Sequence, residues 1–187
     1  MRYRDYLEIS FRWYVFLFIS LYGFGKIMGG QFYRKGMIPA EVAATPIVDV
    51  SSFDLAWVFM GHSFSYILFV GVSQLIGAVC LLFKKTRLLG VIILIPILVN
   101  IIVFDIIFLD AYAALVNAII YFLMLLGILY FHKEKIIEVF RILTTQKKKE
   151  KIEFKTRLKT IVIVACIMLI IFIINQSIGT LIGHGKG

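Results

Sequence analysis

Two long apolar runs on either side of the basic corner Lys84-Lys85-Thr86-Arg87 constrain this chain more than any other feature. Together they extend from Trp57 to Asp105, and each run is about 20 residues or longer, the length a helix needs to cross a hydrocarbon core of ~30 Å. Closed β-barrels also satisfy backbone groups in lipid, but they need short strands of alternating polarity. With 61% hydrophobic and 17% charged residues, the composition is that of a membrane protein. The pattern predicts an all-α, polytopic membrane helix bundle.

Five membrane-spanning helices are expected, at residues 12–30, 55–83, 88–109, 112–131 and 160–182. Ser51, followed by Asp54 three residues later, has the form of a capping box and marks the start of the second helix. That helix would be nearly 30 residues long, so we expect it to tilt or to project from the bilayer. Pro96 predicts a bend in the third span, and the short Asp110-Ala111 turn predicts that spans three and four are antiparallel neighbours.

The same pattern divides the chain into three parts. Residues 1–131 form a four-helix transmembrane core, residues 132–159 a basic amphipathic linker in the cytoplasm, and residues 160–187 a fifth transmembrane helix with a short outer tail. In the linker, apolar residues from Ile136 to Leu143 repeat at helical spacing, which is typical of a helix lying on a membrane surface. The linker residues expected to contact anionic lipid are Lys133, Lys135, Arg141, Lys147, Lys148 and Lys149.

The basic residues also predict the orientation of the chain. Residues 1–12, 84–87 and 132–159 hold three, three and ten Lys or Arg residues, which is sixteen of the 20 in the sequence. All three segments fall on one side of a five-span chain, and the positive-inside rule assigns that side to the cytoplasm. We therefore expect a multi-pass protein of the cell (inner) membrane with its N-terminus inside and its C-terminus outside. Because the charges lie at the ends of apolar runs, the net charge of +9 does not indicate nucleic-acid binding.

Polar residues of four spans are expected at the same depth in the outer half of the membrane. An unpaired charge there costs roughly 2.5–3.5 kcal/mol, so such groups should face one another or a wet cavity. The hypothesis is an outward-facing ligand pocket in which Asp105 pairs with Lys26 or His62. Its predicted lining residues are Lys26, His62, Tyr66, Asn100, Asp105 and Asn117.

These polar groups also admit a purely structural interpretation. They can hold helices together, and Lys26 can extend to the interface with its charge in water. Gln74 lies deeper, where a hydrogen bond between helices is the simpler expectation. One histidine and one aspartate do not make a metal site, and the sequence offers no nucleophile–base pair, so we predict no catalytic residues and favour a protein without intrinsic catalytic activity.

Two segments carry a family resemblance. They are Tyr22-Gly23-Phe24-Gly25-Lys26, at the end of the first span, and the stretch 73–82, which is followed by Lys84-Lys85-Thr86-Arg87-Leu88-Leu89-Gly90. With these motifs, residues 12–131 resemble the DoxX-like family of small bacterial membrane proteins. The chain departs from that family at Gln74, where members often carry an acidic residue, and in its fifth span.

The resemblance implies a four-helix core and a redox-associated role, because members are linked to a thiosulfate–quinone oxidoreductase subunit and to complexes of oxidative-stress defence. The expected function is therefore an accessory or scaffold subunit of a membrane complex. It would dock a partner subunit and hold a quinone or a lipid in the outer pocket. The alternative is a small transporter or channel that uses Lys26, His62 and Asp105 as a proton or anion site, although no inverted repeat is evident. The oligomeric state is not predicted.

Overall fold

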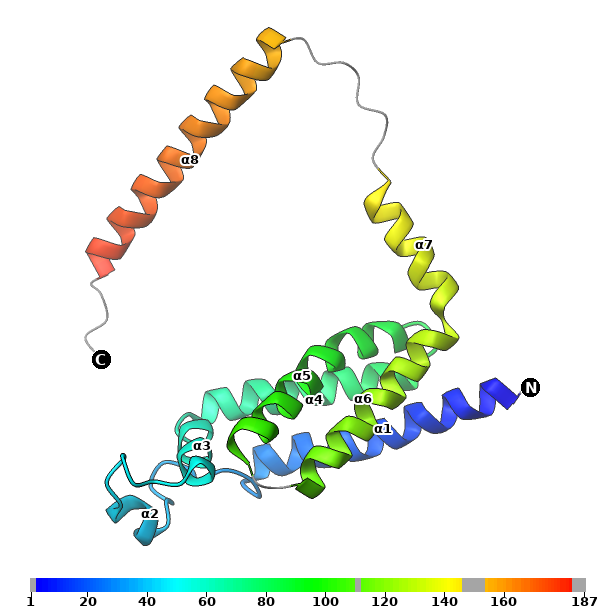
Figure 1. The fold of residues 1–187 in the computed structure, drawn as a ribbon, viewed down its shortest axis with the longest axis vertical. Coiled ribbons are helices and arrows are strands. Elements are labelled where there is room, and N and C mark those ends of the chain that lie inside the picture. Colours follow the sequence, from blue (N-terminus) through cyan, green and yellow to red (C-terminus); the bar gives the residue numbers. More distant parts are fainter. Residues whose placement is uncertain (1–2, 110–111, 146–153, 183–187) are drawn as a thin grey trace. The chain divides into compact units, whose positions relative to one another are not determined.

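A computed structural model describes residues 3–109, 112–145 and 154–182, and within these ranges all regular structure is helical. Figure 1 shows the helices in chain order. They are α1 (Tyr3–Met28), α2 (Ala40–Ala44), α3 (Ser52–Gly61), α4 (Phe64–Leu82), α5 (Arg87–Phe108), α6 (Tyr112–Phe131), α7 (Lys133–Thr144) and α8 (Phe154–Ile182). The chain divides into two units, at residues 1–138 and 139–187, and each is described by itself.

Five of the described helices are long and apolar enough to cross a membrane: α1, α4, α5, α6 and the segment Thr156–Ile178 of α8. The predicted helical membrane bundle is therefore confirmed, and this is a multi-pass membrane protein. The third and fourth spans begin and end within one residue of their predicted limits. The first helix begins nine residues earlier than expected, because the more polar segment Tyr3–Phe11 continues the same helix beyond the apolar run.

In the first unit, α1, α4, α5 and α6 form a ring in which each helix contacts the next and α6 returns to α1 (Figure 1). Short connections make α4 and α5 antiparallel, and α5 and α6 are neighbours as predicted. The core lies on the axis of this ring. It contains Val15, Ile19, Ala78, Leu81, Val91, Leu94, Leu98, Ala118, Tyr121, Leu125 and Ile128.

The prediction of one long second span is wrong. The chain breaks at His62 and Ser63 into the shorter α3 and the membrane-length α4. Ser63 is the N-cap of α4, and its Oγ accepts a hydrogen bond from the backbone N–H of Tyr66 at 3.4 Å. Gly61 ends α3 beside the backbone of Tyr33, where any side chain would overlap the Tyr33 carbonyl oxygen. Local capping therefore interrupts a sequence whose hydropathy is continuous.

The predicted start of α3 is confirmed. Ser51 is its N-cap, and its Oγ accepts a hydrogen bond from the backbone N–H of Asp54 at 3.1 Å. The same hydroxyl lies 2.7 Å from Oδ2 of Asp54 and donates to it. The Tyr33 hydroxyl donates to Oδ1 of Asp54 at 3.2 Å, and this bond ties the loop after α1 to the first turn of α3.

Glycines set the spacing of the helices around α4. A Cβ atom added at Gly71 of α4 would lie 2.9 Å from the carbonyl oxygen of Gly23 in α1, so these two backbones nearly touch. On another face of α4, a Cβ atom added at Gly90 of α5 would lie 2.6 Å from the carbonyl oxygen of Gly77. Small residues thus bring α1 and α5 close to two different faces of α4.

The amphipathic linker helix is present as α7, which carries Lys133, Lys135 and Arg141 and buries none of its residues. Its large apolar side chains, among them Ile137 and Phe140, are exposed. The predicted lipid-contacting residues Lys147, Lys148 and Lys149 lie outside the described residues, as do the Asp110-Ala111 turn and the tail 183–187. In α8, every side chain described, over residues 156–178, is exposed.

Candidate functional site

A cavity of about 450 Å³ opens beside α4 and α5 in the first unit. This wide cavity has a volume typical of a small-molecule site. Its walls are mainly apolar and include Phe69, Ile93, Pro96, Ile97, Ile101 and Phe104. The polar lining residues are Lys26, Gln31, Tyr66, Ser73, Asn100 and Asp105.

A second, smaller cavity of about 100 Å³ lies among α1, α4, α5 and α6. This small cavity shares Lys26, Trp57 and Asp105 with the wide cavity. Its remaining polar lining comes from Tyr22, Gln74, Asn117 and Tyr121, together with Gln31, which lines both cavities. The two cavities therefore meet at a lysine and an aspartate.

Lys26 and Asp105 are both withdrawn from the surface, with 6% of each residue exposed. Lys26 projects from the last turn of α1 and Asp105 from the last turn of α5. Their opposite charges attract each other, and the Lys26 ammonium also lies 5.9 Å from the centroid of the Tyr22 ring. No direct ion pair within 4.0 Å joins these two described residues, so the expected pairing is an attraction through space.

Arg34 holds the end of α1 that carries Lys26. Its guanidinium donates to the backbone carbonyls of Ile27 and, at 3.4 Å, of Lys26, two of the carbonyls that a helix leaves without intrahelical partners at its C-terminus. The Lys26 carbonyl also accepts a hydrogen bond from the backbone N–H of Gly29 at 3.3 Å. The same guanidinium lies over the Phe64 ring, with 5.2 Å between Cζ and the ring centroid. Arg34 thereby connects the C-terminus of α1 to the N-terminus of α4.

Five of the six predicted pocket residues line these cavities. Lys26 and Asp105 line both, Tyr66 and Asn100 line the wide cavity, and Asn117 lines the small cavity.

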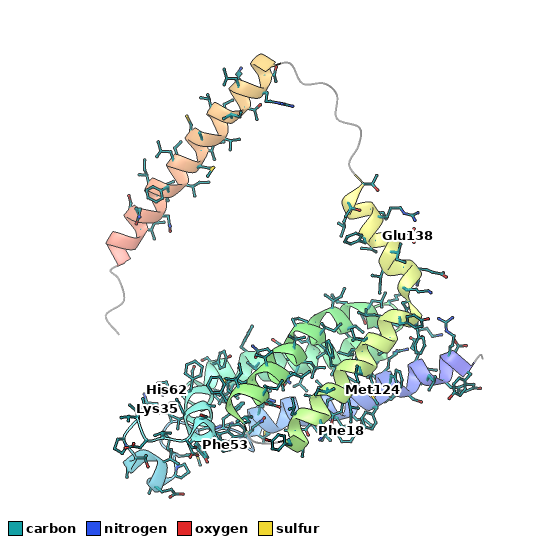
Figure 2. All side chains as sticks on the ribbon, viewed as in Figure 1. Phe18, Lys35, Phe53, His62, Met124 and Glu138 are labelled. Carbon is teal, nitrogen blue, oxygen red and sulfur yellow. The ribbon has the colours of Figure 1, made fainter. Side chains whose placement is uncertain are left out.

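His62 is the exception and lies outside the two cavities. It is exposed at the α3–α4 junction, near the end of the unit that also carries Lys35 and Phe53 (Figure 2). There it lines a separate cavity with Tyr66, Leu55 and Phe59. The physical reason is the helix break: the prediction places His62 by its depth in one continuous helix, whereas α3 ends one residue before it.

Gln74 departs from the expected hydrogen bond between helices. Its side chain is 1% exposed and lines the small cavity, and neither Oε1 nor Nε2 has a hydrogen-bond partner among the described residues. The sequence singles out Gln74 by its position, because it is a polar amide in the middle of α4 between Gly71 and Gly77. At these two glycines the neighbouring helices approach α4 closely.

A second polar centre, which the sequence analysis did not anticipate, joins the opposite ends of the same four helices. Glu8 of α1 lies 2.6 Å from Arg87 of α5 and 3.8 Å from both Arg12 and His132. The Arg12 guanidinium donates to the carbonyls of Leu81 and Leu82 at the C-terminus of α4. In the sequence analysis Arg12 and Arg87 counted only as orienting charges, but both are structural cross-links.

The cavities contain no recognisable metal centre: no group of three His, Cys, Asp or Glu side chains comes together in the part of the chain that the structure describes. Their chemistry is a pair of opposite charges, several neutral hydrogen-bonding groups and a long apolar wall.

Comparison with known proteins finds a similarity over part of the chain. Over 102 residues the chain is 34% identical to a protein of Bacillus subtilis (strain 168) named "Uncharacterized protein YwoB". The match covers 54% of this chain and 62% of that relative, so it spans less than two thirds of the relative's length. No protein-family model matches the chain, and no solved structure matches it.

Proposed function

We propose that this protein is an accessory subunit of a membrane complex that holds an amphipathic small molecule, a quinone or a lipid, in the wide cavity. The observation that carries the proposal is the pair of buried opposite charges, Lys26 and Asp105, at one end of an apolar cavity of about 450 Å³. A polar head finds charged and neutral partners beside these residues. A hydrocarbon chain finds apolar contacts along Phe69, Ile93 and Ile97.

The accessory role extends the DoxX-like resemblance of residues 12–131. It is supported by the absence of an evident nucleophile–base pair from the sequence and by the apolar character of α8, a fifth membrane-length helix against which a partner subunit can pack. In this proposal the reaction takes place on the partner, and the present chain supplies the ligand site and the docking surface.

The proposed location is the cell membrane, with the N-terminus in the cytoplasm and the C-terminus outside. The distribution of Lys and Arg supports this orientation, since sixteen of 20 fall in three segments on one side of the membrane. Enzyme reporters fused after α1 and after α8 test it. Reporter activity on the outer side at both positions agrees with the proposal, and activity on the inner side at either position contradicts it.

The basic face of α7, with Lys133, Lys135 and Arg141, is proposed to lie on anionic lipid. Its exposed Ile137 and Phe140 would then enter the acyl boundary. Hydrogen exchange of the whole chain in nanodiscs tests this proposal. We expect slower exchange of α7 amides when the nanodisc lipid is anionic than when it is zwitterionic, and equal rates would contradict it.

The ligand proposal is tested on protein purified in mild detergent, by native mass spectrometry followed by extraction and identification of lipids and cofactors. We expect a stoichiometric quinone or lipid, and a partner subunit when purification is mild enough. The matched comparison is the Asp105→Leu variant, which should lose the ligand. Wild-type protein without bound ligand or partner would contradict the proposal.

A proton- or anion-coupled transporter is the second candidate, and the buried Lys26–Asp105 pair favours it, because intramembrane charges often mark ion pathways. Proteoliposomes loaded with a pH-sensitive dye distinguish the two functions. Dye signals that follow an imposed gradient in wild type but not in Asp105→Leu would support transport, whereas equal leak rates favour the accessory subunit.

A further inference from the structure

Gln74 is the least exposed of the buried polar and charged side chains in the described residues, at 1%. It extends from the middle of α4 at the level where Gly23 brings α1 into contact, since a Cβ atom added at Gly23 would lie 3.3 Å from the Cβ atom of Gln74. Both amide atoms lack a hydrogen-bond partner. Because an unbonded buried amide is costly, such a group calls for a partner that the described protein atoms do not provide.

The two cavities differ in the side chains that line them. Gln74 lines only the small cavity, whereas Phe69, Ile93 and Pro96 line only the wide cavity. Lys26 and Asp105 line both. Both cavities carry neutral hydrogen-bonding groups, but only the small cavity is lined by the buried amide of Gln74, which lacks a hydrogen-bond partner. An amphipathic molecule can therefore place its head against Gln74 and its chain along the apolar wall of the wide cavity.

The volume of the small cavity and the charges beside it restrict which kind of head group can bind there. The small cavity, at about 100 Å³, is smaller than the ~150 Å³ cavity that holds a benzene ring, so it is too small for a substituted quinone ring. A charged head of either sign would be attracted by one member of the Lys26–Asp105 pair and repelled by the other. The Gln74 amide itself offers a donor and an acceptor side by side.

We propose that the two cavities form one site for a single-chain lipid with a compact, uncharged head that both donates and accepts a hydrogen bond, such as a fatty amide. The head bonds to Gln74 in the small cavity, and the chain lies in the wide cavity. This inference rests on the proposed ligand-holding function and names the class of ligand within it.

Trp57 provides a reporter because it lines both cavities. The chain has only one other tryptophan, Trp13, which is 52% exposed on α1, so the Trp13→Phe variant reports on the site alone. The Trp57 fluorescence of the Trp13→Phe variant is measured while one of three contact quenchers of equal chain length is added. The quenchers are 9,10-dibromostearamide, methyl 9,10-dibromostearate and 9,10-dibromooctadecane. The Trp57→Phe variant, which retains Trp13, measures quenching by probe that merely enters the micelle.

We expect saturable quenching of Trp57 by the amide, about tenfold tighter than by the ester, which cannot donate a hydrogen bond, and weaker still by the hydrocarbon. Adding Gln74→Met should remove the advantage of the amide over the ester. The matched control is Gln176→Met, the same substitution at an exposed position of α8, which should leave all three titrations unchanged.

Equal binding of amide and ester to protein that retains Gln74 would overturn this inference, and that comparison does not depend on whether the Gln74→Met variant folds. The proposed function would then stand, with water as the partner of Gln74. An amide advantage that survives Gln74→Met would also overturn it. Absence of saturable quenching by all three probes and by decylubiquinone would overturn the inference and the proposed function together.

Discussion

Oε1 of Glu8 in α1 lies 2.6 Å from Nη1 of Arg87 in the first turn of α5, across 79 residues of sequence. The same carboxylate lies 3.8 Å from Arg12 and His132, so one acidic group faces three basic side chains from α1, α5 and the end of α6. Glu8 and Arg12 are buried, at 9% and 7% exposure. One acidic side chain therefore connects the ends of three helices.

Replacing Glu8 by Gln should lower the stability of the bundle strongly. The substitution keeps the shape of the side chain but leaves Arg12 and Arg87 facing each other without a carboxylate. Removing one partner of a buried ion pair costs about 3–5 kcal/mol, and the partial exposure of Arg87 favours the lower end of that range. Thermal unfolding in detergent measures the effect. Lys85→Gln, at an exposed position of the nearby corner, is the control and should leave Tm unchanged; equal Tm values for the two variants would contradict the prediction.

The sequence predicted the membrane helices, but it did not predict the helix break at His62 or the burial of Arg12 beside Glu8. Hydropathy predicted the helices because lipid-facing helices such as α5 and α6 must be apolar over the thickness of the bilayer. It missed the break at His62, because a cap such as Ser63 is a local hydrogen bond with little effect on mean hydropathy. Arg12 and Arg87 counted only as charges that orient the chain, because a one-dimensional count of basic residues does not reveal that both lie beside Glu8.

For the candidate site, depth along each span brought together Lys26, Asp105, Tyr66, Asn100 and Asn117, which the structure places around two adjoining cavities. The depth of a residue in the membrane does not show how its helix is rotated about its own axis, and so does not show which neighbours the side chain faces. The unbonded state of Gln74 depends on that rotation and on the Gly23–Gly71 contact, and so only the three-dimensional structure reveals it.

Gly90→Ala should destabilise the contact between α4 and α5. Its Cβ atom would lie 2.6 Å from the Gly77 carbonyl oxygen and 2.9 Å from the Leu81 backbone nitrogen, and neither backbone atom can move independently. Overpacking of this kind costs about 1–3 kcal/mol. The control is Gly25→Ala in α1, where nothing lies within 4 Å of the added atom, so that the higher helix propensity of alanine should leave Tm equal or raised. Equal losses in the two variants would show that the close approach is not formed.

The hydrogen bond between Tyr33 and Asp54 predicts a pH dependence outside the membrane spans. Burial, then the hydrogen bond and negative charge of Asp54, and then the charge of Glu41, raise the pKa of Tyr33. The folded protein thus holds the phenolic proton more tightly than the unfolded chain. The resulting stabilisation is complete below the ordinary tyrosine pKa of 10.0 and is lost as pH rises through the raised pKa.

Asp54→Asn should move the pKa of Tyr33 back toward its ordinary value, because the amide carries no charge. The phenolate absorbance of each protein is titrated, and the curve of the corresponding Tyr33→Phe protein is subtracted to isolate Tyr33. Glu41→Gln, which removes the last and smallest of the contributing charges, should shift the curve less than Asp54→Asn does. An unchanged Tyr33 titration in Asp54→Asn would show that the hydrogen bond does not form in the membrane-embedded protein.

A double-mutant cycle on Lys26 and Asp105 separates the stability of the pair from its proposed role in binding. Either Lys26→Met or Asp105→Leu leaves one charge uncompensated inside the bundle, so each single variant should lose about 2–3 kcal/mol of stability. The double variant removes both charges and should recover most of that loss, with a coupling of about 1–3 kcal/mol. If the double variant has the same Tm as wild type but no longer retains an amphipathic ligand, then the charges of Lys26 and Asp105 serve ligand binding and not folding. Strictly additive losses would show that the two side chains do not interact, and a double variant that retains its ligand would remove them from the site.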